Sequence, residues 1–133
     1  MPAIFECKSV FNCPVEKLFL FHEEPVGFQT LVALDKSVKV LQAPESISKI
    51  GTQAILEVTL APLIKKKWIA EHIGYQKNKI FIDIQKEGPF LSFKHEHRFS
   101  SVGEYSELTD HIEFEFFLNP VSKYFVAQKI KKV

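Results

Sequence analysis

The amino-acid sequence predicts a single α+β domain with a curved antiparallel sheet of about six to seven strands. Helical spacing of apolar residues is confined to the N-terminal third of the chain and to its C-terminal end. From residue 38 onward apolar and polar residues alternate instead, in short runs separated by turn residues. The length of 133 residues suits one domain, and 46% apolar with 25% charged residues is an ordinary globular composition. We therefore assign residues 1–133 to one domain.

The N-terminal third is expected to form a strand and two short helices. Residues 3–11, rich in phenylalanine and valine, have the composition of a strand. Pro14 suits the first helical position, with Asn12 or Cys13 as the N-cap. One face of that helix is then formed by Val15, Leu18, Phe19 and His22. A proline ends it, and a second helix is expected at about 26–34 with inward-facing Phe28, Leu31 and Val32.

The rest of the chain is expected to form a meander and a final helix. Alternation predicts strands at Val38–Leu41, Gln53–Leu60, Lys65–Ile73, Lys79–Gln85, Leu91–Ser100 and Glu107–Phe117. After Pro120, a helix is predicted because apolar residues share one broad arc at Phe125, Val126, Ile130 and Val133. This helix would pack on the concave face of the sheet, since an apolar sheet face must be covered.

Composition excludes several classes of partner and location. Seventeen Lys and Arg against 16 Asp and Glu give a net charge of +1, so no nucleic-acid partner is expected. No uncharged apolar run approaches the ~20 residues of a membrane span. Cys7 and Cys13 are too few for a disulfide framework, and no signal peptide is visible, which predicts a cytoplasmic protein. The 13 phenylalanines predict a dense core or an apolar cavity wall.

The strand at Leu91–Ser100 carries the most informative pattern. Its charged residues must face water, so the opposite set faces inward: Phe93, His95, His97 and Phe99. Imidazoles among phenylalanines are able to orient a ligand carbonyl or carboxylate, or to act as acid and base near neutral pH. The favoured alternative is a pair of core histidines, hydrogen-bonded to a neighbouring strand or to Asp110.

The following strand, Glu107–Phe117, contributes a single inward carboxylate. Its inward set is Leu108, Asp110, Ile112, Phe114 and Phe116. An unpaired buried carboxylate is costly, so Asp110 should pair with a histidine, a backbone donor or a turn. It is expected to anchor the strand or to orient His95 or His97 as an acid.

Metal binding is not predicted from this pattern. The two histidines of the Leu91–Ser100 strand share a face, as in cupins, but the glutamate and further histidine of a cupin site are absent at the required offsets. His111 lies on the opposite face of its strand, with Glu113 and Glu115. We therefore expect no metal and no other cofactor.

Trp68 and the neighbouring lysines allow two interpretations each. Trp68 alternates with His72 on a strand whose faces are both mixed, so its side chain belongs to the core or to a cavity mouth. The run Lys65–Lys67 is interpreted as a solvated segment rather than as a lipid-binding cluster.

Four segments resemble the START-like, Bet v 1-like superfamily, also called the SRPBCC or polyketide cyclase/dehydrase group. They are the helix start Pro14–Phe19, the strand and turn Phe81–Phe90, the histidine strand Phe93–Phe99 and the threonine-aspartate step in Leu108–Phe114. The resemblance implies a helix-grip fold, in which the C-terminal helix packs on the concave face of the sheet. It also implies an apolar pocket for a lipid, a polyketide or a similar small molecule. Members include enzymes, carriers and protein-binding subunits, so the fold does not decide between these roles.

We therefore expect the protein to bind a small hydrophobic molecule rather than to catalyse a reaction. The expected ligand-binding residues are Trp68, Phe93, His95, His97, Phe99, Asp110, Ile112, Phe114 and Phe116. One alternative is a cyclase-, dehydratase- or hydrolase-like enzyme that uses His95 or His97 with Asp110. Another is a protein-interaction module. The expected state is a monomer or a weak homodimer.

Overall fold

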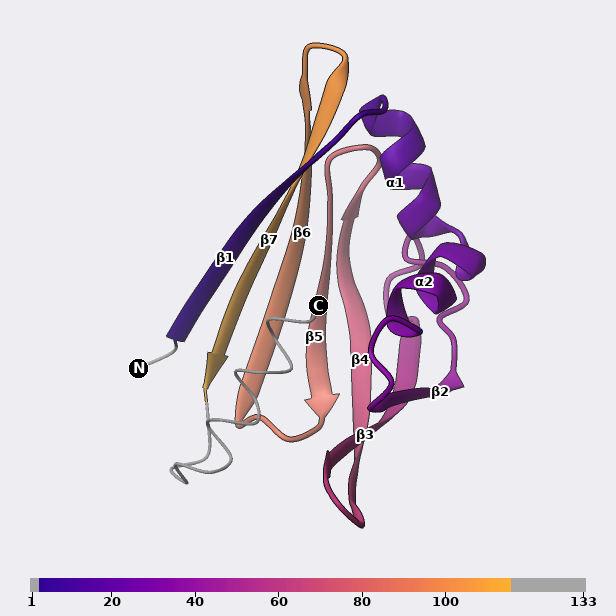
Figure 1. Ribbon diagram of the computed structural model, residues 1–133, viewed down its shortest axis with the longest axis vertical. Helices are drawn as coiled ribbons and strands as arrows, with labels where there is room; N and C mark the ends of the chain where they lie inside the picture. Colours follow the sequence, from indigo (N-terminus) through magenta and orange to yellow (C-terminus); the bar gives the residue numbers. More distant parts are fainter. Residues whose placement is uncertain (1–2, 116–133) are drawn as a thin grey trace.

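The structure, a computed structural model, describes residues 3–115, except for the side chains of residues 25 and 26. The expected C-terminal helix and Phe116 lie outside the described residues. Within them, seven strands form one antiparallel sheet. Two helices follow the first strand in the sequence and precede the second (Figure 1). The predicted α+β class and the order of these elements are confirmed. Neither helix within residues 3–115 is long and apolar enough to cross a membrane.

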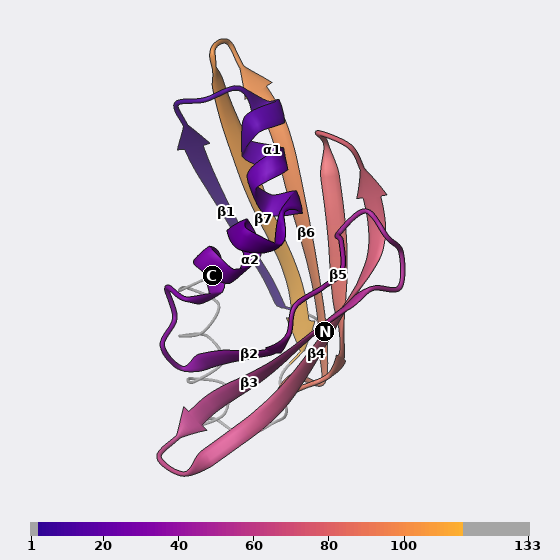
Figure 2. The ribbon, with the colours of Figure 1, turned by 90° about the vertical axis from the view of Figure 1, so that its right-hand side faces the viewer.

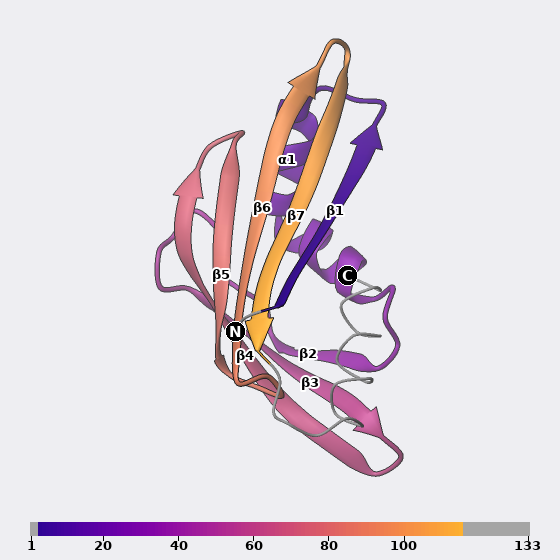
Figure 3. The same ribbon diagram turned by 90° about the vertical axis from the view of Figure 1, so that its left-hand side faces the viewer.

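The sheet is an open meander of its second to seventh strands, and the first strand is added at the edge formed by the seventh. Its strands are β1 (Ala3–Phe11), β2 (Val38–Gln42), β3 (Gln53–Ala61), β4 (Ile64–Gln76), β5 (Ile80–Glu87), β6 (Ser92–Val102) and β7 (Tyr105–Glu115). The order across the sheet is β1-β7-β6-β5-β4-β3-β2, so the first strand of the chain pairs with β7. The helices are α1 (Val15–Glu23) and α2 (Pro25–Val32). Figures 2 and 3 show α1 lying across one face of the curved sheet. We call this the helix-covered face.

Helix α1 begins one residue later than expected. Pro14 is the N-cap, with extended backbone (φ −62°, ψ 150°), so neither Asn12 nor Cys13 has that role. The Pro14 carbonyl accepts hydrogen bonds from the N–H groups of Lys17 and Leu18 at 3.1 and 3.2 Å. The backbone therefore starts the helix without a side-chain cap. As predicted, the residues that α1 buries include Val15, Leu18 and Phe19.

Two further expectations are corrected. Leu31, expected to face inward, is 41% exposed, because α2 contacts α1 and the edge strand β2 rather than the middle of the sheet. Strand β4 continues past its expected end to Gln76, through Gly74. A β-bulge between His72 and Gly74 allows this continuation. A Cβ atom on Gly74 would lie only 2.9 Å from Cδ1 of Ile82, so the neighbouring strand approaches too closely for a larger residue.

Two apolar clusters fill the helix-covered face. The α1 cluster consists of Val15, Leu18, Phe19, Ile47, Phe81, Phe99 and Leu108. The Trp68 cluster consists of Phe90, Phe93, Ile112 and Phe114, with Phe5 and Trp68 packed against it. The first lies beneath a helix, whereas the named members of the second come from strands and from the β5–β6 turn.

Candidate functional site

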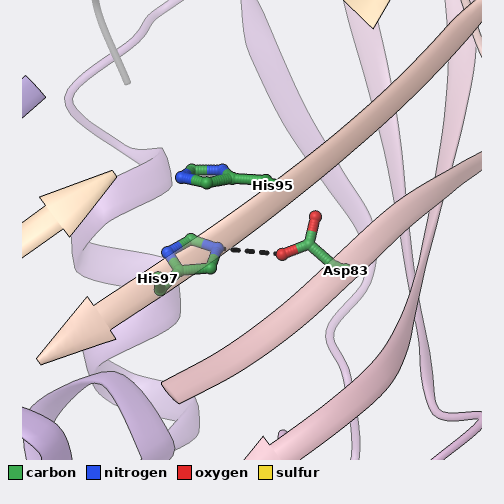
Figure 4. Close-up of side chains that lie close together, drawn as sticks. All are labelled: Asp83, His95 and His97. Atoms are coloured by element: carbon green, nitrogen blue, oxygen red, sulfur yellow. Dashed lines mark hydrogen bonds and ion pairs between the residues drawn. The ribbon is translucent and has the colours of Figure 1, made fainter. Parts of the chain in front are cut away.

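Two histidines and two aspartates meet on the helix-covered face, on three neighbouring strands. His95 on β6 is paired with Asp83 on β5, and His97 on β6 is paired with Asp110 on β7. Directly paired residues share a face of the sheet, so all four side chains project to the same side. Figure 4 shows three of them in close proximity. We call Asp83, His95, His97 and Asp110 the inner cluster.

Two hydrogen bonds and one longer ion-pair contact connect the four side chains. His95 donates from Nε2 to Oδ1 of Asp110 at 2.8 Å, and His97 donates from Nε2 to Oδ2 of Asp83 at 2.9 Å (Figure 4). Nδ1 of His97 lies 3.5 Å from the same Oδ1 of Asp110. His97 is therefore held between two carboxylates, and Asp110 faces both imidazoles.

Ring stacking fixes the orientation of His97. Its imidazole stacks on the ring of Phe81 with centroids 3.9 Å apart and an interplanar angle of 10°. On its other side it stacks on His95 at 3.6 Å and 24°. Because the ring is sandwiched, both of its nitrogens stay directed at the flanking carboxylates.

These contacts give His95 and His97 different protonation states at neutral pH. Burial alone lowers the pKa of His97, but hydrogen bonds to Asp110 and Asp83 outweigh it and raise the pKa to about 9. His97 is therefore positively charged at neutral pH. Burial and the positive charge of His97 lower the pKa of His95, despite its bond to Asp110. His95 is therefore neutral at pH 7.

Both aspartates remain ionised. Burial raises the pKa of Asp110, but hydrogen bonds from His95 and His97 more than offset this and hold the pKa below its usual range. The pKa of Asp83 is likewise lowered, since its bond to His97 and nearby imidazoles outweigh its burial. With two carboxylates against one imidazolium, the inner cluster carries a net negative charge at neutral pH.

Two further histidines border the inner cluster. His72 on β4 is paired with Asp83, is 5% exposed, and has a buried Nδ1 with no hydrogen-bond partner. His22 on α1 donates from Nδ1 to the carbonyl of Leu18 at 2.9 Å, and its ring packs edge-on against Phe99. Burial lowers the pKa of both His72 and His22. Both are therefore neutral at pH 7.

The apolar residues expected at the site fall on two sides of the inner cluster. Phe99 belongs to the α1 cluster, where its ring lies 4.9 Å from that of Phe19. Phe93, Ile112 and Phe114 belong to the Trp68 cluster. The structure therefore divides the expected wall into two apolar patches with polar groups between them.

Trp68 joins the second patch. Its ring packs against Phe93 at 5.1 Å and against Phe90 at 5.5 Å, on the helix-covered face. The sequence left its face open, because a bulged strand does not follow simple alternation. The lysines that precede it, Lys65–Lys67, are exposed as expected.

A hollow elsewhere on the molecule does not involve the histidines. It has a volume of about 310 Å³ and includes Ile84, Lys94 and Glu113 in its lining. These three residues occupy one row on the opposite face of the sheet. We therefore base the candidate site on the inner cluster, where buried polar groups meet.

Asp83 and His72 are the site residues that the sequence did not single out. Asp83 lies in a predicted strand, where its alternation with Phe81 places it on the face of the phenylalanine. Only the register between β5 and β6 shows that it meets a histidine. In chemical terms, Asp83, His95 and His97 form a set of possible metal ligands, with donor atoms within 4.8 Å of one another.

Comparisons with known proteins identify the fold. No protein-family profile matches the sequence, and no curated protein matches it. Similar solved structures include the aromatase/cyclase ZhuI from a Streptomyces species, TTHA0849 from Thermus thermophilus and a START superfamily protein from Mycobacterium smegmatis. Their TM-scores are 0.75, 0.70 and 0.68, at 11%, 14% and 11% sequence identity. The matches cover 99%, 98% and 97% of this chain, and 86%, 86% and 90% of theirs.

Proposed function

Because the chain has the START-like, Bet v 1-like fold, we propose that it binds a small hydrophobic molecule on the helix-covered face of its sheet. The observation that carries the proposal is a buried polar cluster set between two apolar ones on that face. Sites for small molecules commonly combine apolar walls with a few polar groups that fix orientation. The apolar part of the ligand would lie against the Trp68 cluster, and the inner cluster with His72 would hold its polar end.

The charge of the site selects the kind of polar end. The inner cluster is net negative at neutral pH, so a carboxylate on the ligand would be repelled. A neutral hydroxyl or carbonyl group carries no such penalty. It would also provide a partner for the buried Nδ1 of His72, which otherwise remains without a hydrogen bond. We therefore expect a neutral, hydrogen-bonding head group on an apolar body.

Native mass spectrometry with a matched ligand pair tests this proposal. Tetradecanol should bind more tightly than tetradecanoic acid, because the two have the same chain length and only the acid has a charged head group at neutral pH. His72→Phe should weaken tetradecanol binding about fivefold to tenfold, since a hydrogen bond is worth about 1 kcal/mol. The same substitution should leave the protein at least as stable, because it removes an unpartnered buried nitrogen. His111→Phe, on the opposite face, is the matched control and should bind as wild type does. Absence of any bound alcohol, or equal binding by His72→Phe, would contradict the proposal.

A second candidate function is acid–base catalysis, because the two stacked histidines differ in protonation. Neutral His95, oriented by Asp110, has the features of a base, and protonated His97 those of an acid. In a dehydration, His95 would take a proton from carbon while His97 protonates the departing hydroxyl group, so that water leaves. Incubation with a 3-hydroxyacyl thioester, followed by mass measurement, distinguishes the two functions. Loss of one water indicates catalysis, and an unchanged thioester would contradict this second function.

A further inference from the structure

We propose that Asp83, His95 and His97 bind one zinc ion. The proposal does not depend on the hydrophobic ligand, because it rests on the geometry and charge of these side chains and of their neighbours. Two imidazoles and one carboxylate form a ligand set that suits zinc in proteins. The two-residue spacing on β6 places both histidines on one face, and the β5–β6 register places Asp83 opposite His95.

The donor atoms are already close to the separation that a zinc ion requires. They lie within 4.8 Å of one another, and Nε2 of His97 is 2.9 Å from Oδ2 of Asp83 (Figure 4). Zinc ligands bonded at about 2.0–2.2 Å stand roughly 3–4 Å apart. A zinc ion lies in the plane of each imidazole that binds it, so His95 must rotate out of its stack on His97 before all three donors surround one ion.

Asp110 lies where a supporting carboxylate is needed. A histidine that binds zinc through one nitrogen usually donates its other N–H to a carboxylate or carbonyl oxygen. Oδ1 of Asp110 is 2.8 Å from Nε2 of His95 and 3.5 Å from Nδ1 of His97. If His95 binds through Nδ1 and His97 through Nε2, the second nitrogen of each imidazole is the one that faces Asp110 in this structure. One carboxylate would therefore orient both histidine ligands.

The charges of the inner cluster match a divalent ion. The side chains of Asp83 and Asp110 are only 14% and 17% exposed, so their negative charges are poorly solvated. With both imidazoles neutral, as metal binding requires, the two carboxylates balance one zinc ion. A single proton on the histidine pair compensates only half of that charge. The cluster therefore has a deficit of positive charge that a divalent cation removes.

An unpartnered histidine borders the three proposed ligands. Three protein ligands leave one position of a tetrahedral zinc ion for water. His72 is the register partner of Asp83 on β4, and its Nδ1 is buried without a hydrogen bond. A zinc-bound water would provide that missing partner. The orphaned nitrogen is thus a second, independent sign that a group is held here.

Titration of the EDTA-treated full chain with Co²⁺ tests the proposal. Tetrahedral Co²⁺ has visible absorption bands, and these disappear when zinc displaces the Co²⁺. Wild type should saturate at one ion per chain. Asp83→Asn should bind at least tenfold more weakly, and Asp110→Asn about 10–100-fold more weakly through loss of the supporting carboxylate. His111→Gln is the matched control, because it removes a histidine that also contacts carboxylates, on the opposite face. It should bind as wild type does.

Absence of the Co²⁺ bands in wild type, or equal binding by Asp83→Asn, would overturn the proposal. Asp83→Asn removes a partner of His97, so circular dichroism must show that the variant is folded. If it is not, His95→Gln, which keeps the Asp83–His97 pair, decides by the same criterion. Alcohol binding is measured in EDTA. A negative Co²⁺ titration therefore contradicts only the zinc site, and a negative alcohol-binding experiment contradicts only the proposed function.

Discussion

The two faces of β7 carry histidine–carboxylate groups of similar composition in very different surroundings. On the helix-covered face, Asp110 contacts His95 and His97. On the other face, the next residue, His111, donates from Nδ1 to Glu6 at 2.7 Å and lies 3.3 Å from Glu113 through Nε2. We call Glu6, His111 and Glu113 the outer cluster. Its two carboxylates are each 43% exposed, about three times the exposure of Asp83 and Asp110.

This difference decides what each cluster is able to do. The hydrogen bond to Glu6 raises the pKa of His111, as carboxylates raise that of His97. Water screens the outer charges, so their contribution to stability and selectivity is small. The inner charges are shielded from water, so they depend on each other and on any group that enters the site. Residue type and hydrogen-bond distance are alike in both clusters, and burial separates them.

Removal of one carboxylate from each cluster should give the largest difference. Asp110→Ala is expected to lower the free energy of unfolding by about 3–5 kcal/mol, because it leaves His95 without its partner and His97 with one carboxylate. Glu6→Ala should have a much smaller effect, because water screens the charge of an exposed carboxylate. Equilibrium urea denaturation measures both values. Asp110→Asn separates the loss of charge from the loss of volume, and equal costs for the two alanine variants would refute the comparison.

The pH dependence of stability should also identify the inner cluster. The pKa of His97 is raised to about 9 in the folded protein, against about 6.5 when unfolded. A raised histidine pKa stabilises the fold fully below pH ~6.5, and this stabilisation is lost as the pH rises through about 9. The loss amounts to about 3 kcal/mol. Urea denaturation in EDTA at intervals between these pH values measures it.

The other titrating groups around His97 do not obscure the loss of stability that its deprotonation causes. Asp83 and Asp110 have lowered pKa values and titrate only in acid. The lowered pKa values of His95, His72 and His22 affect stability only below about pH 6.5, where the unfolded chain takes up protons first. His97→Gln should therefore flatten the decline, and His111→Gln should largely preserve it. An equally steep decline in His97→Gln would assign it to another group.

Much of the fold follows from patterns within the sequence. Strand alternation is a local property, so the strand containing His95 and His97 was found with its inward face correctly assigned. Spacing on α1 identified its buried residues for the same reason. The start of α1 was misplaced by one residue, because a backbone carbonyl replaced the expected side-chain cap. The extent of β4 was missed, because a bulge allows a glycine to remain within a strand.

The composition of the site could be predicted only in part. Asp110 follows directly from alternation on the adjacent strand, and the structure places it against both histidines. Asp83 required the register between β5 and β6, which no local pattern specifies. The face of His72 could not be predicted from alternation either, because strand β4 has a bulge next to it. The carboxylate that creates the metal-ligand set was thus the residue that sequence alone could not place.

The coupling between Glu6 and His111 is the smallest expected effect, and it tests why the two clusters differ. A double-mutant cycle with Glu6→Gln and His111→Gln should give a small favourable coupling at low salt and pH 6. In about 1 M salt the Debye length falls to ~3 Å, so this coupling should approach zero. The coupling between Asp83 and His97, measured in the same way, should persist, because salt does not reach a buried pair. If salt weakens both couplings equally, water must have equal access to both faces. The inner cluster would then lack the shielding on which its selectivity for a neutral head group and its affinity for a divalent ion both depend.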